Sequence, residues 1–306
     1  MTYLTSYQLI GSIKGPHLLL LGGVHGNEPC GDIALTRLLD DINAKRVTIT
    51  HGTITIVPVC NPEARAQNTR YTETNLNRNL YPKEAPESYE DEVGNELCKI
   101  LAQADLLVDF HSYRRGGPPF AFIGPQNDEN EQELARLTGV DHIVDGFQRA
   151  YEAANIKVDQ RESMGTTEYL RTQGGRGITV ECGQHDDPAA VEFAYQAALR
   201  VLDGLGVAEI TPDLRPPEHT RTPRLYHAHK VIYKERDGVL VRPFKNFESV
   251  EEGQIIARYE DGEDILCPFD GLVIMPDPRP DMPVGEEWVY LGREGTETEN
   301  LRDNAA

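Results

Sequence analysis

The sequence is poor in cysteine and in basic residues, and each shortage excludes a class of protein. Its five cysteines are an odd number without Cys-x-x-Cys spacing, so neither a disulfide scaffold nor a cysteine-rich metal motif is expected. Such thiols suit a reducing compartment, and we expect a cytoplasmic protein in which they are small buried apolar residues.

Positive charge is scarce, because 30 Lys and Arg stand against 50 Asp and Glu, giving a formal net charge of −20. Nucleic acids and anionic membrane surfaces are bound by basic patches, so neither partner is expected. Long apolar runs are also missing. Runs such as Leu18–Leu21 are far shorter than a membrane span, and the N-terminus lacks the basic and apolar regions of a secretory signal.

The order of apolar segments predicts the fold class. The 306 residues are 39% hydrophobic and 26% charged, which suits a globular chain with one large domain and a small one. Strands are expected at 3–13, 17–21, 51–60, 106–110, 120–123 and 178–182, and helices at 31–41, 88–104, 127–137, 164–171 and 189–205. Strands that alternate with helices predict an α/β fold with a largely parallel or mixed sheet.

The composition changes after Gly206. Four prolines lie within 211–223, which predicts a linker. Short β-rich segments then follow, separated by glycine or acidic turns, and predict a small all-β domain. They lie at 230–233, 239–241, 254–257 and 271–274. We therefore predict an α/β domain over 1–210, a linker over 211–223 and a small β domain over 224–306.

A glycine-rich loop at 22–29 follows the first buried strand and carries His25 and Glu28, three residues apart. An imidazole and a carboxylate at this spacing can converge on one divalent ion, and this donor set suits zinc. Alone the pair is not specific, because most such pairs are unrelated polar residues of a loop.

Two further predicted strands end in polar residues, His111 after 106–110 and Glu181 after 178–180. Ligands bind at the carboxyl ends of strands in open α/β sheets, so these groups are expected to meet. His111 is then a third metal ligand, or else a strand-end histidine bonded to a backbone carbonyl. Glu181 is placed to take a proton from an attacking water, or else is a solvated charge.

A long polar loop is predicted over 61–86, and it carries Arg70, Asn77 and Arg78. Guanidinium groups suit carboxylates and developing oxyanions through paired hydrogen bonds. A positive pocket in so acidic a protein indicates a small anionic substrate. The alternative, a solvated basic loop, fits Asn77 and Arg78 less well, because they lie between Leu76 and Leu80.

As an ordered set, these segments resemble the succinylglutamate desuccinylase/aspartoacylase family, a branch of the zinc carboxypeptidase group. The matching segments are Gly23–Glu28, Asn61–Pro62, Thr69–Tyr71, Asn75–Arg78, Asp109–His111 and Val180–Gly183. The resemblance covers residues from about 18 to 206. It implies a zinc-carboxypeptidase-like mixed sheet flanked by helices, and the small β domain behind it fits.

The resemblance also implies roles for residues. It implies one zinc ion (Zn2+) with three protein ligands, His25, Glu28 and His111. Glu181 matches the general base that activates water and later protonates the leaving amine. Arg70 matches the arginine that polarises the scissile carbonyl, and Asn77 and Arg78 match the pair that holds a substrate carboxylate.

Some positions depart from the family pattern or stay open. Many members have an aspartate where this chain has Asn75, so its contact to a metal ligand is expected to be weaker or neutral. Arg114 or Arg115, just after His111, is expected to read a distal acid group, or else is an exposed loop arginine. Tyr290 is expected to reach the substrate, or else belongs to the core of the β domain.

These inferences predict a cytoplasmic zinc-dependent amidohydrolase that hydrolyses the amide bond of an N-acyl amino acid or a related small N-acyl amine. Monomer and homo-oligomer both stay open. One alternative is a zinc carboxypeptidase that acts on short peptides. The other is a non-catalytic binding protein whose metal loop only folds.

Overall fold

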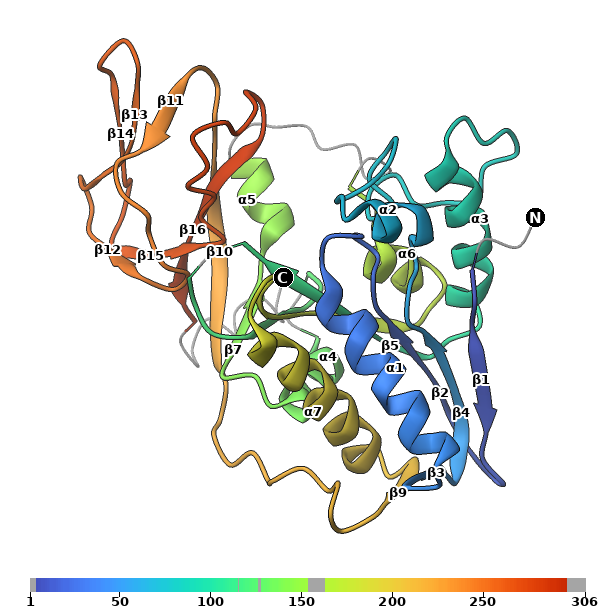
Figure 1. Ribbon diagram of the computed structural model, residues 1–306. Coiled ribbons are helices and arrows are strands. Elements are labelled where there is room, and N and C mark those ends of the chain that lie inside the picture. Colours follow the sequence, from blue (N-terminus) through green and yellow to red (C-terminus); the bar gives the residue numbers. More distant parts are fainter. Residues whose placement is uncertain (1–3, 115, 126–127, 154–162, 296–306) are drawn as a thin grey trace.

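A single mixed sheet of eleven strands runs through the molecule (Figure 1). The computed structural model describes residues 4–114, 116–125, 128–153 and 163–295. The strand order is β1-β4-β2-β5-β8-β6-β7-β10-β16-β15-β12. The α/β fold class and the extra C-terminal strands predicted from the sequence are confirmed.

The central strands β2, β4, β5 and β8 are mutually parallel. Their bounds, with those of the antiparallel edge strand β1, are Tyr7–Ile10 (β1), Ile13–Leu21 (β2), His51–Val57 (β4), Leu106–Tyr113 (β5) and Arg176–Gln184 (β8). Parallel strands end at the same edge of a sheet, so the residues after Leu21, Phe110 and Val180 come together there.

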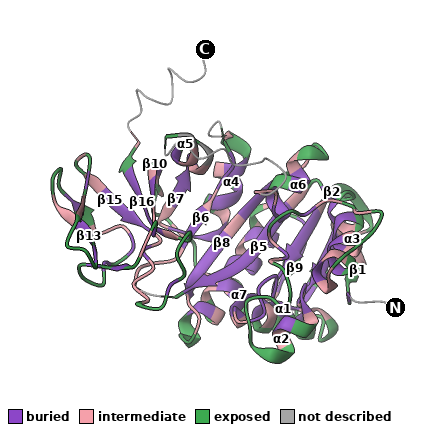
Figure 2. Ribbon diagram, turned by 90° about the horizontal axis from the view of Figure 1, so that it is seen from above, coloured by how far each residue is buried: buried purple, intermediate pink, exposed green. Residues whose placement is uncertain are grey.

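Helices cover both faces of this part of the sheet. Leu18 and Leu20 of β2 pack in one core, and Leu19 and Leu21 pack in another, as alternation along a strand requires. The first core contains residues of α1 (Pro29–Asn43), α4 (Glu129–Thr138) and α7 (Pro188–Gly204). The second contains residues of α3 (Tyr89–Leu101) and α6 (Thr166–Thr172). Burial follows this layering, with β5 and β8 buried over most of their length (Figure 2).

Several short elements were not expected. They are α2 (Pro62–Gln67) within the predicted polar loop, β3 (Val47–Ile49), β9 (Ala208–Ile210), β7 (His142–Asp145) and α5 (Phe147–Ala153). Strand β6 (Phe120–Phe122) was expected and lies between β8 and β7. Among the described residues, no helix combines the length and the apolar character that are needed to cross a lipid bilayer.

The C-terminal part is built from short strands. They are β10 (Arg224–Tyr233), β11 (Gly238–Leu240), β12 (Ser249–Val250), β13 (Ile255–Tyr259), β14 (Asp264–Leu266), β15 (Gly271–Ile274) and β16 (Glu287–Glu294). Strand β10 pairs with β7, so the large sheet continues into this part, while β11, β13 and β14 form a sheet of their own. Residues 211–223 contain neither helix nor strand, and the division into domains at this segment stays a prediction.

Candidate functional site

The loop between β2 and α1 is folded tightly against α2. A Cβ atom on Gly26 would lie 2.1 Å from the carbonyl carbon of Ala64, so only glycine allows this approach. Gly23 has a φ of +56°, which also favours glycine. Glu28 is the N-cap residue of α1, whose first residue is Pro29, and its side chain makes no capping hydrogen bond, so the carboxylate stays available to the histidines. This loop geometry turns His25 and Glu28 toward the edge of the sheet where β5 ends.

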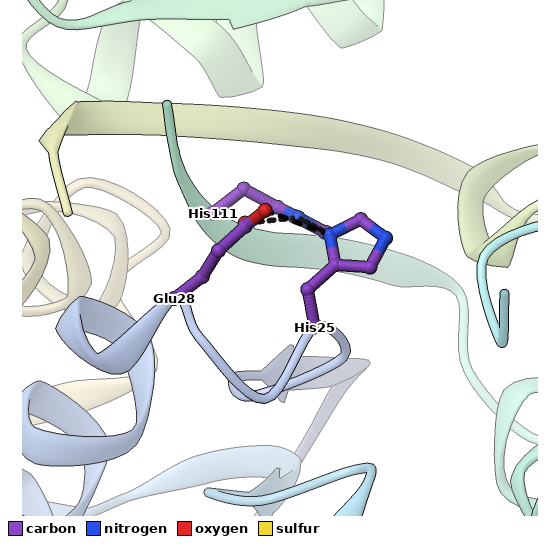
Figure 3. Close-up of side chains that lie close together, drawn as sticks. All are labelled: His25, Glu28 and His111. Carbon is purple, nitrogen blue, oxygen red and sulfur yellow. Dashed lines mark hydrogen bonds and ion pairs between the residues drawn. The ribbon is translucent and has the colours of Figure 1, made fainter. Parts of the chain in front are cut away.

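His25, Glu28 and His111 converge on one point (Figure 3). One oxygen of Glu28, Oε1, lies 2.9 Å from His25 Nδ1, and the other, Oε2, lies 2.9 Å from His111 Nδ1. The two Nδ1 atoms lie 3.2 Å apart. All three side chains are buried. Within the described ranges, they form the one group of at least three His, Cys, Asp or Glu side chains whose donor atoms lie within 4.8 Å of one another.

The second ring nitrogen of each histidine, Nε2, lies close to a polar side chain. Asn75 Oδ1 lies 3.1 Å from His25 Nε2, which is the neutral contact expected from the sequence. Asp109 Oδ2 lies 3.0 Å from His111 Nε2 and accepts a hydrogen bond of 2.6 Å from the Thr166 hydroxyl. Such partners orient the rings of metal-binding histidines. Both Nδ1 atoms are therefore directed at the same point.

The electrostatics of this cluster fit a divalent cation. Burial, aided by the charge of Arg70, lowers the pKa of His25 to about 4, so this ring is neutral and can donate a lone pair. Burial alone would lower the pKa of His111, but Asp109 and Glu28 outweigh it and raise that pKa well above the ordinary value. A positive charge is thus favoured between the two carboxylates. Two imidazoles and one carboxylate are a donor set that suits zinc.

Glu181 lies directly beside this cluster, because it is the partner of His111 in the pairing of β5 with β8. Its side chain is buried, and its Oε2 atom has no hydrogen-bond partner among the described residues. Burial, followed by the charge of Glu28, raises the pKa of Glu181 to about 8. A carboxylate in this environment can accept and return a proton near neutral pH.

Arg70 approaches the same cluster from the loop after α2. Its guanidinium donates a hydrogen bond of 2.9 Å from NH1 to Glu28 Oε1, while 44% of its side chain is exposed. The guanidinium therefore lies at the rim of the cluster, where a second ligand can reach it. This position suits a group that stabilises a developing oxyanion.

A comparison with protein families decides the assignment. The model of the succinylglutamate desuccinylase/aspartoacylase catalytic domain matches residues 14–202. This chain belongs to the succinylglutamate desuccinylase/aspartoacylase family. The family predicted from the ordered motifs is thus confirmed.

Relatives and solved structures agree with this family. The N-alpha-acetyl-L-2,4-diaminobutyric acid deacetylase of Halomonas elongata is 26% identical over 81% of this chain and 71% of its own length. A succinylglutamate desuccinylase/aspartoacylase structure from Rhodobacter sphaeroides has a TM-score of 0.75 at 19% identity, covering 95% of this chain and 90% of the other. The product-bound ectoine utilization protein EutE of Ruegeria pomeroyi has a TM-score of 0.72 at 22% identity, covering 93% and 87%. The chain is therefore similar to hydrolytic deacylases.

Asn77 and Arg78, which the family resemblance assigns to a substrate carboxylate, occupy different environments. Asn77 Oδ1 accepts a hydrogen bond of 2.9 Å from the backbone N–H of Thr166, so this oxygen is used by the start of α6. Arg78 is exposed, and its NH1 donates to the backbone carbonyl of Asn77. Of the two side chains, Arg78 is therefore the one that is open to an anion.

Of the other three predicted substrate residues, Arg114 and Tyr290 lie within the described residues. Arg114 is exposed, and Arg115 lies outside the described residues. Tyr290 is buried, and its hydroxyl oxygen lies 2.5 Å from that of Tyr151 on α5. Tyr290 is therefore part of a packed aromatic group, and its role toward substrate stays a prediction.

His185 was missed by the sequence analysis, although it follows Glu181 by only four residues. Its Nδ1 atom lies 2.8 Å from the hydroxyl of Ser112, the residue after His111. Burial lowers the pKa of His185, and the charges of Arg114 and Arg70 add to this effect against that of Glu28. Arg114 and Arg70 therefore both act electrostatically on His185.

Glu90, also missed, organises the loop that carries Arg70. Its carboxylate accepts hydrogen bonds from the Asn61 amide, the Thr72 backbone and hydroxyl, and the backbone N–H groups of Glu73 and Thr74. Burial alone would raise the pKa of Glu90, but these hydrogen bonds outweigh it and lower that pKa below its ordinary value of 4.5. A single carboxylate thus fixes the loop on α3.

We expect Glu90→Gln to destabilise the fold by about 2 kcal/mol at pH 7, because charge-assisted hydrogen bonds to several donors are lost. A group whose folded pKa is lowered stabilises the fold above its unfolded pKa and loses this contribution as the pH falls. The difference from the unaltered chain should therefore shrink below pH 4.5. Urea denaturation at pH 7 and pH 4 measures both effects. Glu92→Gln, on the exposed side of the same helix, is the control, and equal stability of the two variants would contradict the expectation.

Proposed function

We propose that this protein is a zinc-dependent amidohydrolase that removes the acyl group from an N-acyl amino acid or a related small N-acyl amine. The observation that carries the proposal is the buried convergence of three donor side chains, His25, Glu28 and His111. Glu181, paired with His111 across the sheet, supplies a carboxylate with one unbonded oxygen beside them. Membership of the family supports hydrolytic deacylation.

The relative from Halomonas elongata supports the same bond type, since its name describes removal of an acetyl group from the α-nitrogen of a diamino acid. Arg78 is the group we propose for the carboxylate of the amino-acid half, with Asn77 holding the backbone of this loop in place on α6. The five cysteines are free and buried, which supports our proposal of a cytoplasmic location.

The mechanism follows from the positions of these side chains. A zinc ion held by His25, Glu28 and His111 would polarise the scissile carbonyl and acidify water. Glu181 accepts a proton from the attacking water, whose oxygen forms a bond to the amide carbon. Arg70 donates hydrogen bonds to the oxyanion that develops on the carbonyl oxygen. As the carbon–nitrogen bond breaks, Glu181 returns the proton to the nitrogen, and a carboxylate and an amine leave.

The test is a substrate panel with the zinc-loaded chain. Acetyl and succinyl derivatives of the same set of amino acids are offered together with short peptides, and free amine and bound zinc are measured. We expect one zinc per chain and release of free amino acid from at least one N-acyl derivative, with loss of activity after chelation and recovery with zinc. Release of C-terminal residues from peptides alone would show a carboxypeptidase. Release of nothing would show a binding protein.

A further inference from the structure

A carboxylate surrounded by tyrosines lies where α5 meets the C-terminal strands. Glu287 begins β16 and is the strand partner of Tyr233, which ends β10. Tyr290 lies further along β16, and Tyr151 lies on α5, which packs against β10. Figure 1 shows these three elements side by side. We call Glu287, Tyr151, Tyr233 and Tyr290 the Glu287 cluster.

Hydrogen bonds in the Glu287 cluster end on the carboxylate. The Tyr151 hydroxyl donates to Glu287 Oε1 over 2.7 Å. Because a hydroxyl has one hydrogen, the 2.5 Å contact between Tyr290 and Tyr151 must be donated by Tyr290. The ring of Tyr151 lies edge-on to Tyr290 at 5.9 Å and tilted to Tyr233 at 6.4 Å. A half-buried carboxylate thus accepts a hydrogen bond from a tyrosine that itself packs against two other tyrosines.

The charges of the Glu287 cluster act on Arg78, the group that we propose for the substrate carboxylate. The surrounding protein displaces water from the guanidinium, although the side chain keeps an exposed surface, and this desolvation would lower the pKa of Arg78. The charges of Tyr151, Glu287 and Tyr290 outweigh it and raise that pKa above its ordinary value. Arg78 is exposed and Glu287 is half-buried, so a bound molecule can reach both charges.

This arrangement is complementary to a zwitterion. The guanidinium of Arg78 suits a carboxylate. A carboxylate beside aromatic rings suits an ammonium group, which gains both a charge-assisted hydrogen bond and cation–π contact. We infer that Glu287 is a specificity-determining residue, selecting substrates whose amine half carries a second, positive charge on a short side chain. This inference rests on the proposed function. It assigns recognition of the charged end of the substrate's side chain to Glu287, a carboxylate of the C-terminal part.

The experiment compares three N-acyl amino acids that differ only at the end of the side chain. The probes are the Nα-acyl derivatives of 2,4-diaminobutyrate, norvaline and aspartate, with the acyl group found best in the panel above. Diaminobutyrate and norvaline have nearly the same size, so charge is the variable. We expect kcat/KM for the ammonium substrate to exceed that for norvaline by about 30-fold, and Glu287→Gln to reduce this ratio below about 3-fold.

Binding of the free amino acids gives a readout that does not depend on hydrolysis. Calorimetric titration of the full chain should show diaminobutyrate binding about 30-fold more tightly than norvaline, and Glu287→Gln should remove this difference. If the chain hydrolyses no N-acyl compound but keeps this binding preference, the proposed function fails and the cation site stands. Absence of the preference in both assays would overturn the inference while leaving the deacylase intact.

Two variants complete the test. Glu286→Gln removes the same charge one residue away, at an exposed position, and should leave the ratio unchanged. Tyr151→Phe removes only the hydroxyl donor to Glu287 and should reduce the ratio several-fold, which decides the matter if Glu287→Gln does not fold. If Glu287→Gln lowers kcat/KM for all three substrates by one factor, Glu287 only positions Arg78, and the inference is wrong.

Discussion

Glu181→Gln is expected to lower kcat for amide hydrolysis by about 1,000-fold while zinc stays bound. Glutamine has nearly the same shape but cannot accept the proton of the attacking water or return it to the leaving nitrogen. Glu181 does not belong to the group of metal-binding donors, so the metal affinity should change little. Steady-state kinetics and metal analysis of the purified variant measure the two properties separately.

The control for Glu181→Gln is Glu192→Gln, the same chemical change on the exposed surface of α7. It should leave kcat unchanged. If Glu181→Gln retained more than about a tenth of the original kcat with zinc bound, Glu181 would not be the base. If the variant lost its zinc, the carboxylate would be holding the metal site together, and the proposed division of roles would be wrong.

Arg70→Ala is expected to lower kcat by 100- to 1,000-fold, about 3 kcal/mol of transition-state stabilisation. The guanidinium donates to Glu28 from the rim of the cluster and is partly exposed, so it can also reach an oxyanion. KM should change less than kcat, because the developing charge exists only in the transition state. Kinetics at saturating substrate, together with the zinc content, measure this effect.

Arg65→Ala is the matched control for Arg70→Ala. Arg65 lies five residues earlier, and its Nε atom donates to Asp32 on α1 over 2.8 Å. Its removal should leave kcat within about twofold of the original value. A near-normal kcat in Arg70→Ala would show that the oxyanion is stabilised without this arginine.

The convergence of His25, Glu28 and His111 could be predicted, because these residues follow apolar strands whose pattern is visible in the sequence. Three strands are adjacent in the sheet. They are β2, which ends before His25, β5, which carries His111, and β8, which carries Glu181. Strand type and parallel order were therefore enough to bring these side chains to one edge. Helix α1 starts at Pro29 rather than at Gly31, because proline is favoured in the first turn of a helix.

The supporting residues could not be predicted, because their partners lie far away in sequence. Glu90 is an acidic residue in the first turn of a helix, and such residues are usually solvated. Its hydrogen bonds to 72–74 depend on how the loop folds back on α3. Glu287 was missed because β16 was not recognised as a strand, although 288–291 are all apolar. Its meeting with Tyr151 also required α5, which has only seven residues.

The pairing of β7 with β10 has a consequence for how this chain can be divided. Strand β7 has β6 on one side and β10 on the other. Cutting the chain before β10 would turn β7 into an open edge whose N–H and C=O groups invite pairing with other molecules. The part that carries His25, Glu28 and His111 is therefore expected to aggregate when it is produced without the C-terminal strands, because β10 covers the edge of β7.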